Sequence, residues 1–236
     1  MPGTDFYRIF AWMAQHICRL MRFRARGSRD FDEALMTNRI VQVLSLILLV
    51  FAVAVPARAQ GADPAAAAVQ NFYDALVASM KSGGTAKSRY EKLKPAVEQS
   101  FDLPGMTALS VGPGWSSMTP ADQKALIDAF ERMTIANYAR NFDSYSGEKF
   151  TVDPTVVDRN SDKLVKSTLK PSNGDSIPFN YRLHQAGGSW KIVDIYLNGN
   201  ISQLAQKRSD FGATLQASGP EGLAKKINAL ADQTLG

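Results

Sequence analysis

The sequence predicts an α+β fold in which helices come first, a four-stranded antiparallel meander follows, and two helices close the chain. Two observations predict this order. Apolar residues recur at helical spacing from residue 64 to about residue 142, and the period changes to two between residues 150 and 197. After residue 201 the helical spacing returns. We therefore expect N-terminal helices, a meander curled around an apolar cleft, and two C-terminal helices.

The chain begins with residues that do not resemble a folded domain. Residues 40–55 form an apolar run, and the small-x-small pattern that ends at Ala59 is typical of a signal peptide cleavage site. The run is short for a membrane-spanning helix, which needs about 20 apolar residues. The sequence thus predicts a signal peptide over residues 36–59 and one domain over residues 60–236. Residues 1–35 are then a mis-assigned start or a basic leader, and the alternative is an uncleaved inner-membrane anchor at residues 40–55.

Charge and cysteine content exclude several function classes for residues 60–236. The chain has 27 Lys and Arg against 22 Asp and Glu, but 8 of the basic and 4 of the acidic residues precede residue 60. The remaining net charge of about +1 gives no support for a nucleic-acid partner. The only cysteine, Cys18, lies in the leader, and His184 is the only histidine after it. A zinc site needs more such ligands, so we expect no metal and no cofactor.

The first helices have clear start and stop signals. Asp63 before Pro64 is typical of a helix N-terminus, and Ser82-Gly83-Gly84 predicts the end of that helix. A second helix is expected over residues 85–99, although Pro95 should kink it or split it in two.

Two more helices are expected before the sheet. A short apolar helix through Leu109 and Val111 should end at Gly112. Thr119 and Pro120 then begin a helix that runs to Asn141 or Phe142 and should be the longest in the protein.

Four strands are predicted where the period is two, over residues 150–157, 164–169, 177–184 and 190–197. Asn173-Gly174 and the glycines at 187 and 188 supply the hairpin turns. The last strand is apolar on both faces, with Trp190, Ile192 and Tyr196 on one and Val193, Ile195 and Leu197 on the other. The sheet should therefore curl and bury part of both sides.

The sequence predicts two closing helices after the sheet. The first should start at about Ile201, with Leu204, Phe211 and Leu215 facing inward. The second should start at Pro220, with Leu223, Ile227 and Leu230 facing inward.

Asp194 is the most unusual polar residue, because apolar side chains flank it in the last strand. One interpretation is a general base in an apolar pocket of a small cone-shaped α+β enzyme, with Tyr181 or Tyr196 as its partner. The other is a structural carboxylate that pairs with Arg182 or accepts from a backbone donor.

Short motifs spread along residues 60–236 resemble the MlaC-type periplasmic phospholipid-binding proteins, the toluene-tolerance family. The motifs are Asn71-Phe72-Tyr73-Asp74-Ala75-Leu76, Arg89-Tyr90-Glu91-Lys92-Leu93, Phe101-Asp102-Leu103-Pro104, residues 112–115, Ala129-Phe130, residues 138–142 and Trp190-Lys191-Ile192-Val193-Asp194. After the last strand, Gly199-Asn200-Ile201-Ser202-Gln203-Leu204 is similar to the hopanoid-associated HpnM-like branch.

This resemblance implies a soluble, non-enzymatic carrier in the periplasm. Its ligand would be a phospholipid or a hopanoid, which it would shuttle between the inner and outer membranes. The implied partner is an inner-membrane lipid transporter complex, with no nucleic acid, and we expect a monomer. A third hypothesis is an interaction subunit with a filled core that assists a membrane assembly.

A lipid carrier needs many interchangeable apolar contacts. A two-chain lipid has roughly 30 methylenes, and at ~0.8 kcal/mol each their exposure to water costs on the order of 20 kcal/mol. The candidate ligand-binding residues are Phe72, Leu76, Met80, Leu103, Met106, Phe130, Met133, Tyr138, Phe179, Tyr181, Val193 and Ile195. For each of them the alternative is ordinary core packing.

Overall fold

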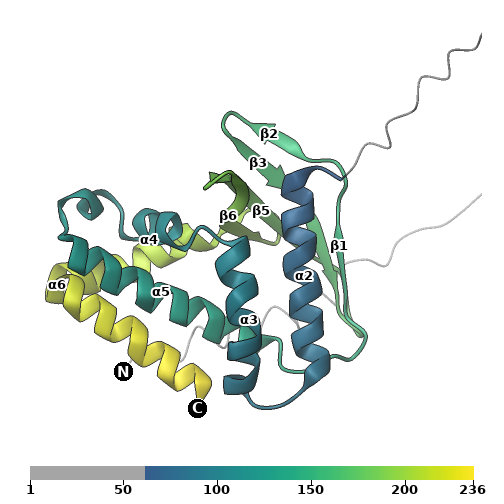
Figure 1. Ribbon diagram of the computed structural model, residues 1–236, viewed down its shortest axis with the longest axis horizontal. Coiled ribbons are helices and arrows are strands. Elements are labelled where there is room, and N and C mark those ends of the chain that lie inside the picture. Colours follow the sequence, from purple (N-terminus) through teal and green to yellow (C-terminus); the bar gives the residue numbers. More distant parts are fainter. Residues whose placement is uncertain (1–61) are drawn as a thin grey trace, which may run out of the picture. The chain divides into compact units, whose positions relative to one another are not determined.

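The computed structural model describes residues 62–236, which form one compact unit (Figure 1). The expectations for the signal peptide, the membrane anchor and the leader therefore lie outside the described residues. Within residues 62–236, no helix combines the length and the apolarity that crossing a membrane requires.

Two helices with clear caps begin the described part. Helix α2 spans Pro64–Ser82, and the Asp63 carboxylate accepts a hydrogen bond of 2.8 Å from the Ala65 N–H, which confirms the predicted start. Helix α3 spans Ala86–Ser100 and passes through Pro95 without a break, so the predicted split does not occur. Buried Leu93 and Val97 hold it on both sides of the proline.

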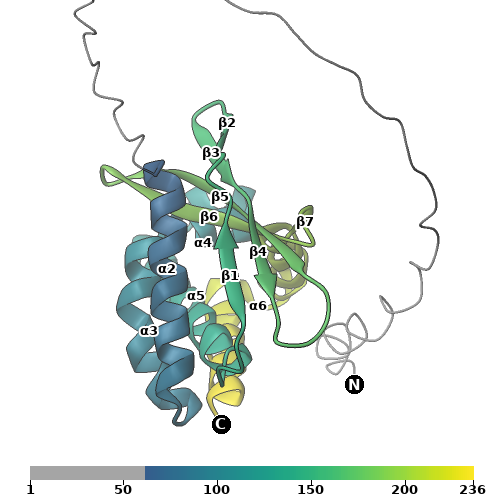
Figure 2. The same ribbon diagram turned by 90° about the vertical axis from the view of Figure 1, so that its right-hand side faces the viewer.

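The next helices also follow their predicted signals. Helix α4 spans Leu103–Val111, with Asp102 as its N-cap, and a 3₁₀ turn, η2, follows over Pro113–Ser117. Helix α5 spans Pro120–Asn141, with Thr119 as its N-cap. In Figure 2, α2 and α3 lie side by side, and α2 contacts the sheet that follows in the sequence.

The sheet has seven strands rather than four. Their bounds are β1 Lys149–Val152, β2 Val157–Arg159, β3 Asp162–Val165, β4 Ser167–Lys170, β5 Ile177–Ala186, β6 Ser189–Leu197 and β7 Ile201–Ser202. All pairs are antiparallel: β1 with β4, β2 with β3, both β3 and β4 with β5, β5 with β6, and β6 with β7. The predicted meander is therefore confirmed, but each of its first two strands is broken into two.

Both breaks occur at the same level of the sheet. Asp153 accepts a hydrogen bond from the Thr155 N–H at 2.8 Å, which makes a local turn, and Pro154 lacks an N–H for a ladder. On the neighbouring strand the break falls at Lys166, whose carbonyl accepts from the Asp153 N–H at 2.9 Å. The strand pair therefore bends as a unit here.

A β-bulge changes the faces of the last strand. Arg182 pairs with Asp194, but Leu183 pairs with Ile192, so Val193 is an extra residue on β6. Ile195, opposite Tyr181, therefore lies on the same face as Ile192. The predicted grouping, which put Ile192 and Ile195 on opposite faces, is wrong because one inserted residue reverses the alternation.

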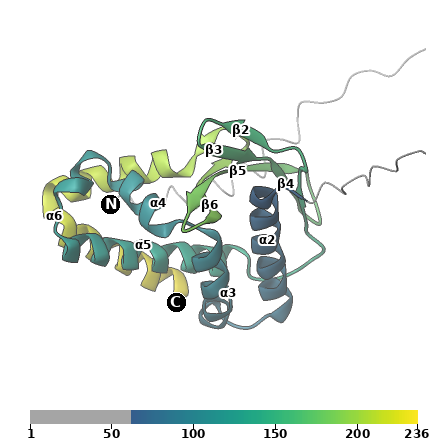
Figure 3. The ribbon, with the colours of Figure 1, turned by 45° about the horizontal axis from the view of Figure 1, so that its top comes forward.

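Helix α6 spans Gln203–Leu235 and is broken at Gly219, which has φ 66° and ψ −172°. Its two halves correspond to the two predicted helices, although Ile201 and Ser202 form β7 instead of the first helical turn. Helix α5, with 22 residues, is the longest only if these halves are counted separately. Figure 3 shows the first half running away from the sheet beside α4 and the second half returning along α5.

The second half of α6 packs differently from the prediction at one position. Leu230 was expected to face inward, but it is 42% exposed. The buried side chains are Leu223, Ala224, Ile227 and Ala231, so the inward stripe follows a spacing of four residues and leaves Leu230 beside it.

Candidate functional site

Most candidate ligand-binding residues lie in one buried apolar cluster. Eight of the candidate residues belong to this cluster, and each is at most 4% exposed: Phe72, Leu76, Met80, Leu103, Met106, Phe130, Met133 and Tyr181. Tyr138, Phe179 and Ile195 pack against this cluster and are half-buried. Val193, the bulge residue, is buried outside it. The structure thus brings eleven of the twelve together.

The centre of the cluster is aromatic. The Phe72 ring meets the rings of Phe101 and Tyr138 edge-on, with centroids 4.9 Å apart in both cases. Tyr138 in turn stacks on Phe142 at 5.9 Å. Tyr138 is half-buried as a residue. Its phenol nevertheless lies among these rings, and this burial raises the pKa of the Tyr138 hydroxyl well above its ordinary value.

A buried hydroxyl chain connects α2 to the sheet behind these rings. The Tyr73 hydroxyl lies 2.6 Å from the Ser167 Oγ, and Ser167 also contacts the Phe179 carbonyl. Burial raises the pKa of Tyr73, an effect that its hydrogen bonds to Ser167 and Tyr181 partly offset. Sequence reasoning missed this contact, because Tyr73 and Ser167 are 94 residues apart and nothing in the local pattern pairs them.

Asp194 is 4% exposed, and donors of its own chain occupy both of its oxygens. Oδ1 accepts from the Ile195 N–H at 2.8 Å and the Leu204 N–H at 3.2 Å, and Oδ2 accepts from the Ser202 hydroxyl at 2.7 Å. Arg182 lies opposite on β5. These bonds fix the start of α6 to β6, which agrees with the structural interpretation of Asp194.

Tyr196, one of the two tyrosines proposed as a partner of Asp194, has a raised pKa. Burial raises the pKa of Tyr196, and the neighbouring Asp194 carboxylate raises it further. Tyr196 is therefore a neutral hydrogen-bonding neighbour of the carboxylate. Its pairing with Ser202 across β6 and β7 belongs to the same junction.

His184 is part of a second junction between sheet and helices. Its Nε2 lies 2.7 Å from the Asp102 carboxylate, the N-cap of α4. The Asp102 N–H also donates to the Ile192 carbonyl at 2.9 Å. His184 thus holds the α3–α4 connection against β5 and β6. Among residues 62–236, no group of three His, Cys, Asp or Glu side chains is arranged to hold a metal.

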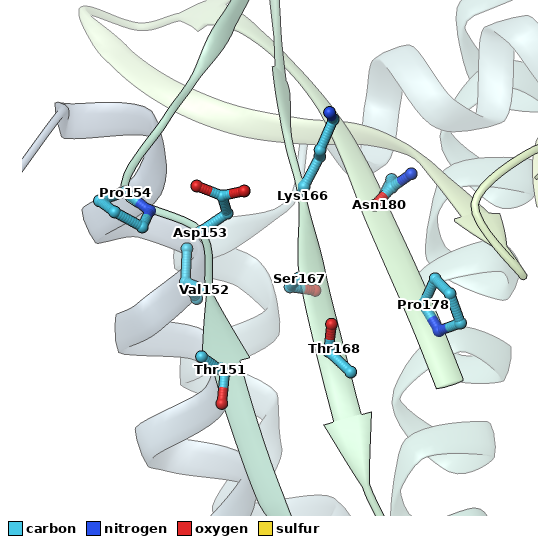
Figure 4. A pocket seen from close by; sticks show the side chains of 9 residues that line it. All are labelled: Thr151, Val152, Asp153, Pro154, Lys166, Ser167, Thr168, Pro178 and Asn180. Atoms are coloured by element: carbon cyan, nitrogen blue, oxygen red, sulfur yellow. The ribbon is translucent and has the colours of Figure 1, made fainter. Parts of the chain in front are cut away.

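A groove with a volume of about 530 Å³ lies at the break of the sheet (Figure 4). Its lining residues are Thr151, Val152, Asp153, Pro154, Lys166, Ser167, Thr168, Pro178 and Asn180. Most of these side chains are polar or charged, and none belongs to the candidate ligand-binding set.

Comparison with known sequences finds a matching family model and a similar known protein. The family model described as MlaC protein matches residues 67–229, more than half of the chain. The toluene tolerance protein ttg2D of Pseudomonas putida is 25% identical over 201 residues, which cover 82% of this chain and 92% of that protein.

Comparison with solved structures gives a similar fold. The phospholipid-binding protein from Ralstonia solanacearum, solved in complex with a phospholipid, matches with a TM-score of 0.65. The match covers 74% of this chain and all of that chain, at 22% sequence identity. At this identity the likeness establishes the architecture of helices and sheet.

Proposed function

The chain belongs to the MlaC family, and from that premise we propose that it is a periplasmic carrier that binds the hydrocarbon part of a lipid. Two relatives support the proposal, one named for toluene tolerance and one solved with a phospholipid. The observation that carries it on this chain is the apolar cluster around Phe72, which extends to the half-buried side chains of Tyr138, Phe179 and Ile195.

The energetics of the cluster suit a ligand that must be both held and released. A two-chain lipid with roughly 30 methylenes would regain on the order of 20 kcal/mol on leaving water for an apolar site, about what a bilayer offers. Phe130 and Met133 are at most 3% exposed, so in this state they contact other side chains instead of a ligand. Binding would then replace contacts within the protein with contacts to lipid, which keeps the net affinity moderate.

The finer parts of the proposal follow the sequence resemblance. The cargo is a phospholipid or a hopanoid, and the carrier moves it between inner and outer membranes as a monomer. It receives or delivers the cargo at an inner-membrane transporter complex. A signal peptide over residues 36–59 directs it to the periplasm, with an anchor at residues 40–55 as the alternative.

We also propose that the protein is not an enzyme. The candidate general base, Asp194, accepts hydrogen bonds from Ile195, Ser202 and Leu204, and these bonds hold α6 in place. A general base needs a free acceptor directed at a substrate proton. The position of Asp194 supports a structural role.

The test is mass spectrometry of the full chain expressed in a bacterium and purified from its periplasm. Under native conditions the protein should carry the added mass of one lipid, and solvent extraction should identify it as acyl or polycyclic. The denatured mass should correspond to a chain that begins at Gln60. A protein free of lipid in both the native spectrum and the extract would contradict the carrier role.

A further inference from the structure

Four hydroxyl groups gather within the apolar cluster, and they come from four elements. They belong to Tyr73 on α2, Tyr138 on α5, Ser167 on β4 and Tyr181 on β5. The Tyr73 hydroxyl lies 2.6 Å from the Ser167 Oγ, and the Tyr73 ring meets the Tyr181 ring edge-on, with centroids 5.7 Å apart. Burial raises the pKa of Tyr181, and the nearby Tyr73 and Tyr138 phenols raise it further. The three phenols therefore share one region between the helices and the sheet.

Three of the four hydroxyls have partners within the protein. The Ser167 hydroxyl donates to the Phe179 carbonyl. Because its only proton is used there, the Tyr73 hydroxyl is the donor in the bond to Ser167. Tyr181 hydrogen-bonds to Tyr73 in turn. Tyr138 is the one member of the group that remains outside this chain of hydrogen bonds.

The Tyr138 hydroxyl makes no hydrogen bond to any other group of residues 62–236. Its ring lies against the rings of Phe72, Phe101 and Phe142, which offer no oxygen or nitrogen as a partner. A hydroxyl that leaves water for such surroundings loses hydrogen bonds that nothing in the protein replaces. Because the residue is only half-buried, a group from outside the protein can reach this hydroxyl.

The surroundings of these phenols contain no charge that would offset an anion. Burial, the neighbouring phenols and Ser167 shift the pKa values of Tyr73, Tyr138 and Tyr181, and no Lys or Arg side chain is among the causes. A phosphate group placed here would lose its hydration without gaining a cation. The ligand group that matches the site is therefore a neutral oxygen, which is the hydroxyl of a lipid alcohol or the carbonyl of an acyl ester.

We propose that the Tyr138 hydroxyl donates a hydrogen bond to a neutral oxygen of the bound lipid, and that it thereby selects lipids with a hydroxyl or an acyl ester beside their hydrocarbon. This inference rests on the proposed carrier function and adds a polar requirement to that same site. The phenyl rings around Tyr138 contact the hydrocarbon, and its hydroxyl recognises the oxygen.

Displacement of a bound tracer by two matched pairs of lipids tests this proposal. The full chain is expressed in a bacterium, purified from the periplasm and loaded with a fluorescent phosphatidylglycerol. The first pair is diplopterol, a pentacyclic alcohol, and diploptene, the related hydrocarbon without the hydroxyl. The second pair is dioleoyl phosphatidylglycerol, which has ester carbonyls, and its dioleyl ether analogue, which has none. Each competitor is delivered from cyclodextrin, and the readout is the concentration that displaces half of the tracer.

In at least one pair, the lipid with the oxygen should displace the tracer at a concentration about fivefold lower than its partner. A preference in the first pair alone identifies a lipid hydroxyl as the recognised group, and a preference in the second pair alone identifies an ester. Tyr138→Phe removes only the hydroxyl and should bring the two members of that pair to within about twofold of each other. The matched control is Tyr145→Phe, at an exposed phenol, which should keep the fivefold preference.

Urea unfolding separates recognition of the lipid from a role in folding. Because Tyr138→Phe breaks no hydrogen bond within residues 62–236, the unfolding midpoint of the lipid-free variant should not fall below that of the original protein. A lower midpoint, equal displacement within both pairs, or a preference that survives Tyr138→Phe contradicts the hydroxyl site alone. Failure of the tracer to bind to any form contradicts the carrier role, and the hydroxyl site with it.

Discussion

Three tyrosines place their hydroxyl groups inside the apolar core. Tyr73 contacts Ser167, and Tyr138 and Tyr181 lie among aromatic rings. Burial raises the pKa of each phenol, because an apolar surrounding disfavours the charged tyrosinate. At neutral pH these hydroxyls are neutral groups in a site otherwise suited to hydrocarbon.

These shifts predict a loss of stability in alkaline solution. A phenol in the unfolded chain ionises near pH 10, whereas the buried ones stay protonated. Their stabilising contribution is therefore complete below pH 10 and is lost as the pH rises toward the raised folded values. Urea unfolding should show a midpoint that falls steadily above pH 10, and tyrosinate absorbance should appear fully only on unfolding.

A pair of variants separates this effect from general alkaline damage. Tyr73→Phe removes one buried phenol and its bond to Ser167, at a cost of about 1 kcal/mol at pH 7, and it should flatten the alkaline decline. Tyr145 is 39% exposed, so Tyr145→Phe should change neither the stability at pH 7 nor the steepness of the alkaline decline. If Tyr73→Phe leaves the alkaline decline as steep as before, its buried phenol does not cause it.

At the residue level the sequence predicts burial well and contacts poorly. Phe72, Leu76 and Met80 follow helical spacing, so their burial could be read from the chain. The contact of Tyr73 with Ser167 could not, because it arises only when α2 docks on β4. That the apolar set contacts lipid stays a prediction, since spacing cannot distinguish core packing from a ligand site.

The junction between β6 and α6 depends on a single carboxylate. Asp194 accepts from the N–H groups of Ile195 and Leu204 and from the Ser202 hydroxyl. Asp194→Ala should destabilise the protein by about 2–4 kcal/mol, because it leaves buried donors unpaired. Asp194→Asn should cost only about 1 kcal/mol, since the amide oxygen can still accept.

Chemical denaturation, followed by circular dichroism, measures this order of stabilities. Asp158→Asn is the control, because the Asp158 side chain is 82% exposed and should change stability little. Lipid co-purifying with Asp194→Asn is the expected result for a carrier. An Asp194→Ala variant as stable as the original protein would contradict the role of this carboxylate in joining β6 to α6.

At the level of elements, local sequence signals predict where helices start but miss where strands break. Asp63 and Thr119 mark their helices because the cap is a local interaction. The breaks at residues 153–156 and at Lys166 escape an analysis of periodicity, since the side-chain turn at Asp153 interrupts an otherwise strand-like pattern. The bulge at Val193 is hidden as well, because Ile192, Val193 and Ile195 are all apolar and either register places apolar side chains on the buried face.

For the whole molecule, composition and the order of elements were sufficient for the fold class. Helices, meander and closing helices appear in the predicted order, and the family match covers residues 67–229. The reversal of α6 at Gly219 brings its second half along α5, an arrangement that depends on packing between distant segments. Where the apolar cluster opens depends on the same long-range packing and has no local signal.

The central claim is that hydrocarbon lies in the apolar cluster between sheet and helices, and photolabelling tests it directly. The full chain is loaded with a phosphatidylglycerol that carries a diazirine near the end of one acyl chain, irradiated, digested and analysed by mass spectrometry. We predict adducts on Phe130, Tyr138, Phe179 and Ile195, the buried and half-buried members of the cluster. Adducts confined to the groove around Thr151, Lys166 and Thr168 would contradict the account.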